Sequence, residues 1–350
     1  MKTKVCPGRL ALIVGLLMMA MTVTACGGDA SEAPGDAIQE LIKVRLSEVT
    51  HSVFYAPQYV ALTEGFFEDE GLDVDLRTAW GSDRGAAAVI SGQADIALAG
   101  PEPAIYVYNQ QSDNPLLIFA QLTATDGSFL MSREPIQDFT WDMVRDRVIL
   151  GQRPGGMPQM VLEYVLRQHG LKPNVDVDVI TNIEFAAIPG AFASGTGDFV
   201  TLFEPIPSDF EAQGEGHVVA SMGTEGGPLP YTVYMCTSDY ADSHPEVLQR
   251  FTNALYRGML WVHAEEAQRV AESLAPHFPD TPPETLVSVV NRYKEQGSWA
   301  PNPVVDPSHF ERLQDVMIDG KVLEEDERVP YDAIIVTEFG ELAIDGITGP

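Results

Sequence analysis

The sequence predicts an α/β protein with two lobes, each built around a sheet of mainly parallel strands. Segments typical of strands and of helices alternate at the spacing of βαβ units, between residues 43 and 99 and again between 147 and 203. Without the N-terminal segment described below, the chain of roughly 300 residues also exceeds the length at which a single hydrophobic core usually divides. We therefore expect two Rossmann-like lobes, one for each series.

The first series begins with a predicted strand at 43–49 and a helix at 56–64 that Gly65 ends. A strand at 72–79, a helix at 84–91 that Gly92 ends, and a strand at 95–99 follow. The second series repeats this order, with strands at 147–151, 176–181 and 198–203 and helices at 158–169 and 188–194. In the helix at 158–169, Val161, Tyr164 and Val165 share one face and Gly170 marks its end.

Beyond the second series we expect a strand at 231–237 and then further helices to about residue 340. Ser243, His244, Pro245 and Glu246 form a capping-box pattern with proline in the first turn, which predicts where the first of these helices begins. Extended segments near residues 121 and 231 connect the two series. Lobe one is therefore expected to be discontinuous, at 41–125 plus 232–345, with lobe two at 126–231.

Residues 1–25 are expected to form a lipoprotein signal peptide. Lys2, Lys4 and Arg9 precede an apolar run at 10–23, which is shorter than the roughly 20 residues of a membrane-spanning helix. Residues 23–26 (Val-Thr-Ala-Cys) resemble the lipobox of bacterial lipoproteins, in which the cysteine is acylated after cleavage. Cys26 is therefore expected to anchor the protein extracytoplasmically, on the outer face of the cell membrane or in the periplasm, followed by a disordered linker at 26–40. The alternative is an ordinary signal peptide with an incidental cysteine.

Composition excludes several classes of function. A net charge of −30 leaves no positive surface for nucleic acid. The three cysteines are Cys6, Cys26 and Cys236, which supply no disulfide framework and no paired-cysteine metal site, and the seven histidines lack metal-ligand spacing. No nucleotide-binding or hydrolase motif occurs in a supporting context. We expect no metal, no cofactor and no catalytic residue, with Cys236 buried in a strand.

Several stretches resemble one superfamily. These are HSVFYAPQYVA at 51–61, EGFF at 64–67, GLDV at 71–74, SGQADIA at 91–97, and the segments 151–171 and 195–205. They are similar to the nitrate, sulfonate, taurine and thiamine-precursor binding proteins of ABC importers. The resemblance implies a type II periplasmic-binding-protein fold whose lobes close over a small molecule. It also implies a monomer whose partners are the permease and, through it, a cytoplasmic ATPase.

In open α/β sheets, ligands bind beyond the carboxyl ends of parallel strands, at the loops that lead into helices. Two such loops lie in the first series. The first supplies His51, Phe54, Tyr55 and Gln58, and the second supplies Trp80 and Arg84. Aromatic rings with polar tips can stack on a flat ligand, and an arginine can pair with an anionic group. The alternatives are that Phe54 and Tyr55 pack a helix onto the sheet and that Arg84 is solvated.

The remaining candidates follow later strands. Glu102, between two prolines, would need a donor partner if buried, or else would cap the next helix in solvent. In lobe two, the loop with Arg153, Gly155, Gly156 and Met157 precedes a helix, whose N-terminus can receive an acidic group. Phe203, Glu204 and Tyr231 complete the candidate set, with Glu204 in the lobe-two position equivalent to that of Glu102.

Two carboxylates and several rings favour a flat, nitrogen-bearing ligand, such as a thiamine-type pyrimidine or a flavin. The alternative is a sulfonate, nitrate or taurine-type oxyanion. A remoter alternative is an enzyme resembling the fungal pyrimidine synthases, which consume a histidine and use a cysteine-rich site that this chain lacks. A lipoprotein that signals to a membrane receptor instead of feeding a transporter is also left open.

Overall fold

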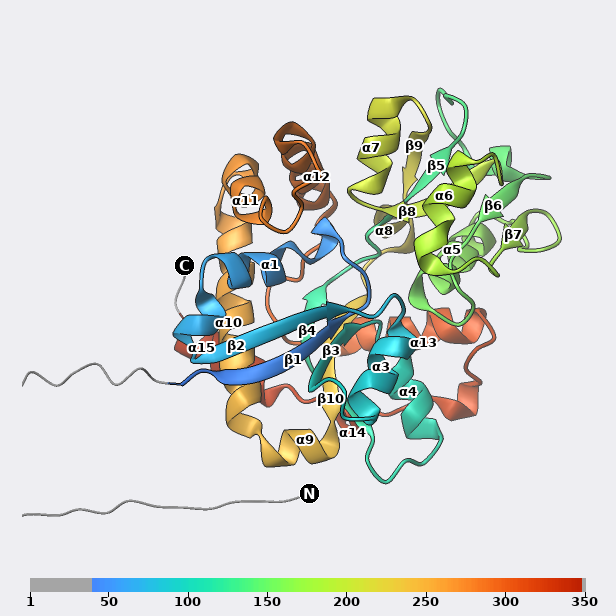
Figure 1. The fold of residues 1–350 in the computed structure, drawn as a ribbon. Coiled ribbons are helices and arrows are strands. Elements are labelled where there is room, and N and C mark those ends of the chain that lie inside the picture. The colour runs from blue at the N-terminus through green and yellow to red at the C-terminus, as the bar shows by residue number, and fades with distance from the viewer. Residues whose placement is uncertain (1–39, 348–350) are drawn as a thin grey trace, which may run out of the picture. The chain divides into compact units, whose positions relative to one another are not determined.

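The computed structural model describes residues 40–347 and contains two five-stranded sheets, with strand orders β2-β1-β3-β10-β4 and β7-β6-β8-β5-β9 (Figure 1). The α/β class predicted from the sequence is confirmed. The predicted signal peptide, Cys6, the predicted lipidation site Cys26 and all of the predicted 26–40 linker except Glu40 lie outside the described residues. No helix between residues 40 and 347 is long and apolar enough to cross a bilayer.

The first sheet combines early strands with one late strand. Its strands are β1 (Ile42–Glu48), β2 (Leu72–Thr78), β3 (Ile96–Ala99), β4 (Leu116–Thr123) and β10 (Thr232–Thr237). β1 pairs in parallel with β2 and β3, so their carboxyl ends meet at one edge of the sheet. β10 inserts antiparallel between β3 and β4. The chain thus leaves this sheet after β4 and returns to its middle.

The second sheet is built entirely from the intervening segment. Its strands are β5 (Ser128–Ser132), β6 (Val148–Leu150), β7 (Asp178–Ile180), β8 (Phe199–Phe203) and β9 (His217–Ser221). β6 pairs in parallel with β7 and β8, whereas β5 runs antiparallel between β8 and β9. Every residue of β5 and β8 is buried, which explains why these strands consist largely of Phe, Leu, Val and Met.

Helices follow most strands, as the alternating pattern predicts. Up to β10 they are η1 (Val53–Tyr55), α1 (Ala56–Thr63), α2 (Phe66–Asp69), α3 (Ser82–Ile90), α4 (Glu102–Asn109), η2 (Trp141–Val144), α5 (Met157–Gln168), η3 (Phe185–Ala187), α6 (Ile188–Ala193), α7 (Ile206–Gln213) and α8 (Met222–Gly226). After β10 they are α9 (Ser238–Ser243), α10 (Pro245–Ala264), α11 (Ala267–Leu274), α12 (Pro283–Gln296), α13 (Pro307–Asp319), η4 (Glu325–Glu327), α14 (Tyr331–Ile334) and α15 (Glu338–Gly346).

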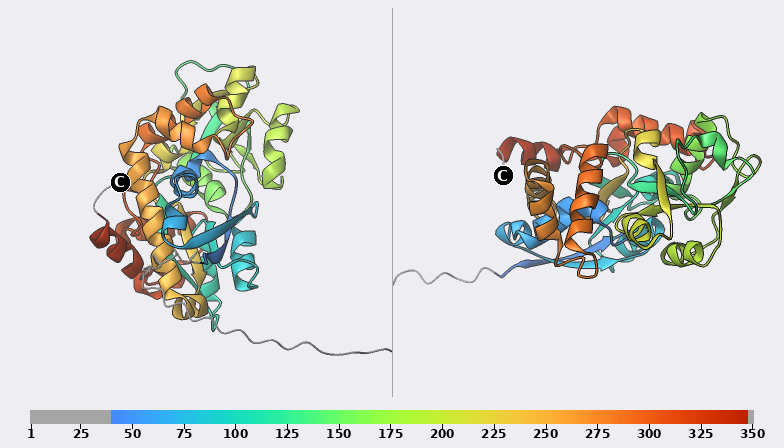
Figure 2. Two further views of the ribbon diagram at one scale, coloured as in Figure 1. Left: turned by 60° about the vertical axis from the view of Figure 1, so that its left-hand side comes forward. Right: turned by 90° about the horizontal axis from the view of Figure 1, so that it is seen from above.

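The long helix α10 covers the first sheet. It packs against α1, α2 and α15, and Figures 1 and 2 show it beside the blue N-terminal elements. Its Val247, Phe251, Leu255 and Val262 are buried, as their spacing predicts. Gly258 lies so close to α1 that a Cβ there would overlap the backbone oxygen of Pro57. Close contact between these two helices therefore depends on the missing side chain.

Two sequence-based assignments need correction. Ser243 does not cap α10, because it is the last residue of α9 and its hydroxyl donates to the backbone oxygen of Asp239 at 2.6 Å. His244 is the N-cap residue instead, with no side-chain capping bond. The extended segment near residue 121 belongs to β4, and β9 was not predicted, because its residues are only partly buried and show no clear alternation.

The residue ranges of the strands in each sheet can be compared with the predicted lobe boundaries. Strands of the first sheet come from residues 42–123 and 232–237, and strands of the second come from 128–221. Boundaries at 125/126 and 231/232 fall between strands of different sheets. The lobe ranges themselves remain a prediction.

Candidate ligand-binding cleft

A cavity of about 550 Å³ lies where loops of the two sheets meet. From the first-sheet side it is lined by Val49, Ser82, Asp83, Glu102 and Tyr106, among others. From the second-sheet side it is lined by Gln152, Arg153, Pro154, Gly155, Gly156, Pro158 and Phe185. The loops after β1, β2, β3 and β6 all contribute, which is the strand-end location expected for a ligand site in this class of fold.

Glu102 is the buried acid of this cavity. It opens α4, its side chain is 2% exposed, and its Oε2 has no hydrogen-bond partner among the described residues. Its carboxyl group lies over Gly100, where a Cβ would overlap it, so the close approach requires glycine. Burial raises the pKa of Glu102 to about 7. A fraction of the protein therefore carries this group protonated at neutral pH.

Gln152 supplies a second unsatisfied acceptor. It follows β6, and its Nε2 donates to the backbone oxygen of Thr201 at 2.6 Å. This bond fixes the amide, and its Oε1 is left buried without a donor in the part of the chain that the structure describes. A buried acceptor without a donor costs free energy, which a ligand N–H or O–H could recover.

The cationic residue of the cavity wall is already paired. Arg153 donates two hydrogen bonds, both of 2.9 Å, to the carboxylate of Asp83 at the start of α3. Gly81 makes room for this pair, because a Cβ there would contact the Arg153 guanidinium. The interaction joins a loop of the second sheet to a loop of the first.

Two further hydrogen bonds join elements of the first sheet to elements of the second in the same region. Arg84 donates to Glu184 at 2.8 Å, and the hydroxyl of Tyr106 donates to the backbone oxygen of Gly155 at 3.1 Å. Arg84 is not among the residues that line the three cavities, and its contact with ligand remains a prediction. Its side chain is 47% exposed and holds the segment before η3.

The glycine loop before α5 faces an acidic group of the protein itself. Gly156 is the N-cap of α5, and a Cβ placed on it would lie 3.9 Å from Oε1 of Glu102. Gly155 adopts a φ of 76° and donates its N–H to the side chain of Gln159 at 3.1 Å. The positive end of this helix is thus directed toward Glu102.

A second cavity of about 290 Å³ is lined mainly by rings. His51, Trp80, Phe185, Phe203 and Phe278 form much of its wall, with Thr50, Gln152, Leu202, Glu204, Ile206 and others. A smaller space of about 20 Å³ shares lining residues with both cavities and is lined by Tyr55, Met157, Phe203 and Tyr231, among others.

His51 enters the second cavity from a buried polar cluster. Its Nδ1 lies 3.1 Å from Glu48, its Nε2 lies 2.8 Å from the backbone oxygen of His277, and its ring stacks on Phe278 with centroids 4.6 Å apart. The hydrogen bond to Glu48 raises the pKa of His51. Burial lowers the pKa of His277. The two histidines therefore have opposite protonation preferences.

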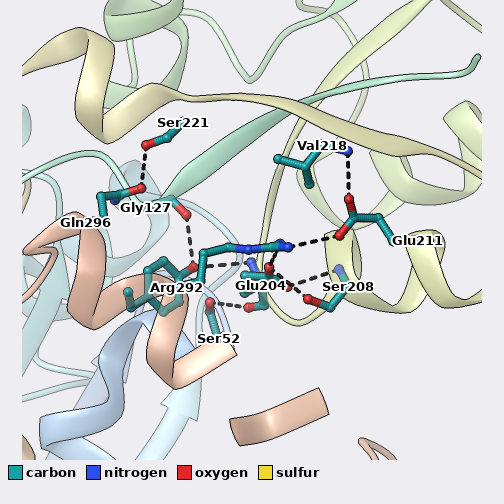
Figure 3. A network of polar contacts seen from close by, with 10 residues as sticks. Ser52, Gly127, Glu204, Ser208, Glu211, Val218, Ser221, Arg292 and Gln296 are labelled. Carbon is teal, nitrogen blue, oxygen red and sulfur yellow. Dashed lines mark hydrogen bonds and ion pairs between the residues drawn. The ribbon is translucent and has the colours of Figure 1, made fainter. Parts of the chain in front are cut away.

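Glu204 lines the second cavity, but its carboxylate already has partners. Figure 3 shows the guanidinium of Arg292, from α12, between Glu204 and Glu211. Ser208 donates to Glu204 through its hydroxyl at 3.0 Å and its N–H at 3.1 Å. Glu204 is fully buried, and burial raises its pKa even though Arg292 opposes the rise. Glu204 therefore differs from Glu102, which has no cation.

Phe54 and Gln58 are not among the residues that line the three cavities, and their contact with ligand remains a prediction. Phe54, in η1, is fully buried against Tyr55, Phe203, Tyr231 and Tyr293. Gln58, on α1, donates to Glu48 at 3.1 Å and accepts from the Tyr234 hydroxyl at 2.9 Å. The helical turn that starts at Val53 rotates both side chains into the core.

Three residues that line the cleft, and one that pairs with Glu204, were not singled out from the sequence. Gln152 adjoins the glycine loop, and Phe185 lies in η3, where no periodicity marks it. Phe278 follows α11, and Arg292 reaches Glu204 across 88 positions of the chain. Only Gln152 had a usable sequence cue, since it directly follows a predicted strand end.

Comparisons with known proteins agree on the family. Residues 44–275 match the family described as NMT1-like. YtlA of Bacillus subtilis (strain 168), which carries the name of a binding protein, is 43% identical over 328 residues, or 94% of this chain and 95% of that protein. The nitrate/nitrite binding protein NrtA of Synechococcus elongatus is 24% identical over 264 residues, or 67% of this chain and 56% of that protein.

A solved structure supports the same fold. The alkanesulfonate-binding protein SsuA from Xanthomonas axonopodis pv. citri, bound to MOPS, superposes with a TM-score of 0.68 at 17% identity, covering 85% of this chain and 99% of that one. The resemblance to nitrate and sulfonate binding proteins and the periplasmic-binding-protein fold are thus confirmed. On this evidence the chain belongs to the NMT1-like family.

Proposed function

We propose that this protein is the extracytoplasmic solute-binding component of an ABC importer. It captures a small molecule between lobe one, at 41–125 plus 232–345, and lobe two, at 126–231, and delivers it to the permease without chemical change. The family, the fold shared with named binding proteins, and a cavity at the strand ends of both sheets support this role. The ion pairs across the cleft support closure around ligand.

Attachment to the membrane is proposed to occur through Cys26. The lipobox-like residues 23–26 and the linker that follows support an acylated N-terminus. Mass spectrometry of the mature N-terminal peptide is expected to find a diacylglyceryl cysteine, and Cys26→Ser is expected to release the protein into the extracytoplasmic fluid. An unmodified peptide that begins elsewhere would contradict the anchor.

The proposed ligand is a flat, nitrogen-bearing heterocycle, such as a thiamine-type pyrimidine or a flavin. One observation carries this proposal: Glu102 Oε2 and Gln152 Oε1 are buried acceptors, on residues that line the same cavity, and have no donor among residues 40–347. A ring with N–H groups can satisfy such acceptors while its faces pack on apolar walls. Phe185 and Tyr106 supply the aromatic part of that wall.

A second candidate ligand is a small oxyanion of the nitrate or sulfonate kind. The names of the relatives favour it, because NrtA is a nitrate/nitrite binding protein and SsuA an alkanesulfonate-binding protein. The charges around this cavity favour it less. Arg153 is paired with Asp83, and the N-terminus of α5 is directed toward Glu102, so an oxyanion would have to displace one carboxylate or the other.

A thermal-shift screen distinguishes these ligands, because a ligand that binds only the folded state raises its melting temperature. Residues 31–350 contain the whole compact unit at 40–350 and suit the assay. Cytosine, 4-aminopyrimidine and riboflavin are compared with nitrate, sulfate and taurine, and hits are measured again with Glu102→Gln. Stabilisation by ring compounds that Glu102→Gln weakens supports the proposal. Stabilisation by oxyanions alone would leave the transport role intact and replace the ligand.

A further inference from the structure

Phe185 lies where the three spaces of the cleft meet. It lines the cavity of about 550 Å³, the cavity of about 290 Å³ and the small space of about 20 Å³. It belongs to η3, packs against Phe203 with ring centroids 6.1 Å apart, and is partly exposed. The two larger cavities are therefore neighbouring compartments of the cleft that share Phe185 in their walls. We call them the Glu102 compartment and the Trp80 compartment, after one residue that lines each.

The two compartments differ in chemistry. The Glu102 compartment contains the buried carboxyl group whose Oε2 has no partner. In the Trp80 compartment the two ionisable side chains already have partners, since His51 contacts Glu48 and Glu204 contacts Arg292. Its remaining wall consists largely of rings and aliphatic side chains. The Glu102 compartment therefore contains a buried acceptor without a donor, whereas the Trp80 compartment offers mainly apolar surface for a ring to cover.

Gln152 connects the two compartments. It is one of the two residues that line both large cavities, together with Phe185. Its side chain is buried, and its Oε1 has no hydrogen-bond partner within residues 40–347. A ligand that extends from one compartment to the other would therefore pass an unsatisfied acceptor at the junction.

We propose that the ligand consists of two ring systems joined by a short linker that carries an N–H. The donor-bearing ring occupies the Glu102 compartment, the second, apolar ring lies among Trp80, Phe203 and Phe278, and the linker N–H donates to Gln152 Oε1. This inference rests on the proposed function, and it narrows the ligand from a single heterocycle to a two-ring class. The second cavity becomes a specificity subsite.

Three commercial purines test this arrangement by isothermal titration calorimetry on the mature chain from residue 26, with Cys26→Ser to keep it free of lipid. Adenine has one ring system, 6-benzylaminopurine adds a second ring through an N–H linker, and 6-benzyloxypurine has the same shape with an ether linker. We expect 6-benzylaminopurine to bind at least about tenfold more tightly than either of the others, because it alone adds both a ring contact and a donor.

Two variants assign the effects to residues. Trp80→Gly is expected to weaken 6-benzylaminopurine by roughly tenfold while changing adenine affinity less than about twofold, because Trp80 lines only the second large cavity. Gln152→Leu is expected to remove the preference for the amine over the ether. The comparison of the three purines on the unmodified side chains does not depend on either variant folding.

The outcomes separate this inference from the proposed function. Equal affinity for adenine and both benzyl compounds, or weaker binding of the larger ones, overturns the two-ring ligand and leaves a single-ring heterocycle in place. Binding of cytosine or 4-aminopyrimidine without binding of any purine has the same meaning. If no ring compound binds and nitrate or taurine does, both the two-ring ligand and the heterocycle proposal fail.

Discussion

Arg153 and Asp83 form a bidentate ion pair, with both nitrogen–oxygen distances at 2.9 Å, between the loop before α5 and the first turn of α3. Because the two loops belong to different sheets and line the same cavity, the pair stabilises the arrangement in which the two loops lie together. Both side chains are partly exposed, so its contribution is modest.

The first prediction concerns this pair. Asp83→Asn is expected to raise the dissociation constant for ligand by about threefold at low salt, with a smaller difference at high salt because exposed charges are screened. Titration calorimetry at two salt concentrations measures both values. Arg77→Ala, which breaks an ion pair with Asp75 within β2, is the control. An equal effect from the control would show that the closure argument is wrong.

The second prediction concerns pH. The pKa of Glu102 in the folded state is about 7, above its usual 4.5, so between these values the folded state binds more protons than the unfolded state. Stability contributed by this group therefore falls as pH rises from 4.5 to 7, by up to about 3 kcal/mol. Denaturant unfolding at several pH values should show a shallower decline for Glu102→Gln than for the wild type.

A comparison variant exists for this experiment. Burial also raises the pKa of Asp126 to about 7, so Asp126→Asn is expected to reduce the decline of stability with pH by a similar amount. Asp126 lines none of the three spaces of the cleft. Ligand affinity should therefore change in Glu102→Gln and not in Asp126→Asn. If Glu102→Gln keeps the full pH slope of the wild type, the buried acid is not the source.

The third prediction concerns backbone conformation. Trp80 has a φ of 61°, which costs a residue with a Cβ about 1–2 kcal/mol, and its side chain is 39% exposed. Trp80→Gly is expected to raise the free energy of unfolding of the unliganded protein by about 0.5 kcal/mol. Gln111→Gly, at a φ of 55° and outside the cleft walls, should give a similar gain. A loss of stability at residue 80 with a gain at 111 would mean that the tryptophan ring is a packing residue.

The fourth prediction concerns the fully buried Glu204. Removing its cation with Arg292→Leu leaves a buried carboxylate without a charged partner and is expected to cost about 3 kcal/mol of folding free energy. The double variant Glu204→Gln with Arg292→Leu should recover more than half of that loss, because no buried charge remains. Urea denaturation measures both. No recovery in the double variant would assign the loss to packing of the arginine stem.

The fifth prediction concerns His51 and His277, whose pKa values shift in opposite directions. NMR titration is expected to find the pKa of His51 above 6.5 and that of His277 below it. The stability that His51 contributes is present below pH 6.5 and lost as pH rises through its folded pKa, whereas the contribution of His277 is lost as pH falls. Glu48→Gln should lower the pKa of His51. Coincident titration of both rings would contradict the hydrogen bond to Glu48.

Sequence patterns predicted well where strands end. They predicted less well which side chains near those ends face a cavity, and the structure shows why. Glu102, Trp80 and the glycine loop line cavities because a residue directly after a strand lies at the sheet edge, and their contact with ligand remains a prediction. Phe54 and Gln58 lie only a few residues further along the chain, but η1 and α1 turn them into the core. The direction in which a helix points its side chains is set by packing, and it cannot be predicted from the position of the preceding loop.

Partners distant in the sequence were beyond prediction. The helical periodicity of α12 could predict that Arg292 lies on a helix, but not that it would pair with Glu204. Phe185 lies in a segment without periodicity, and its position at the junction depends on how the second sheet meets the first. From the sequence, the charged groups of Glu204 and Arg153 were therefore expected to be available to a ligand. The structure shows that each of them is paired with another side chain of the protein.

Because β10 is the last strand within residues 40–347, all strands of the second sheet are made before the first sheet can be completed. As the chain emerges from its N-terminus, all five strands of the second sheet are present once Ser221 has been made, whereas the first sheet still lacks its fourth strand in spatial order. Until Thr232–Thr237 follows, the edges of β3 and β4 have no strand to pair with, and unpaired edges are sites of aggregation. Thr123 and Thr232, whose hydroxyls lie 2.5 Å apart, then bring the two ends of the intervening segment together. A chain released before residue 237 would therefore contain every strand of the second sheet, while the first sheet would still have a gap between β3 and β4.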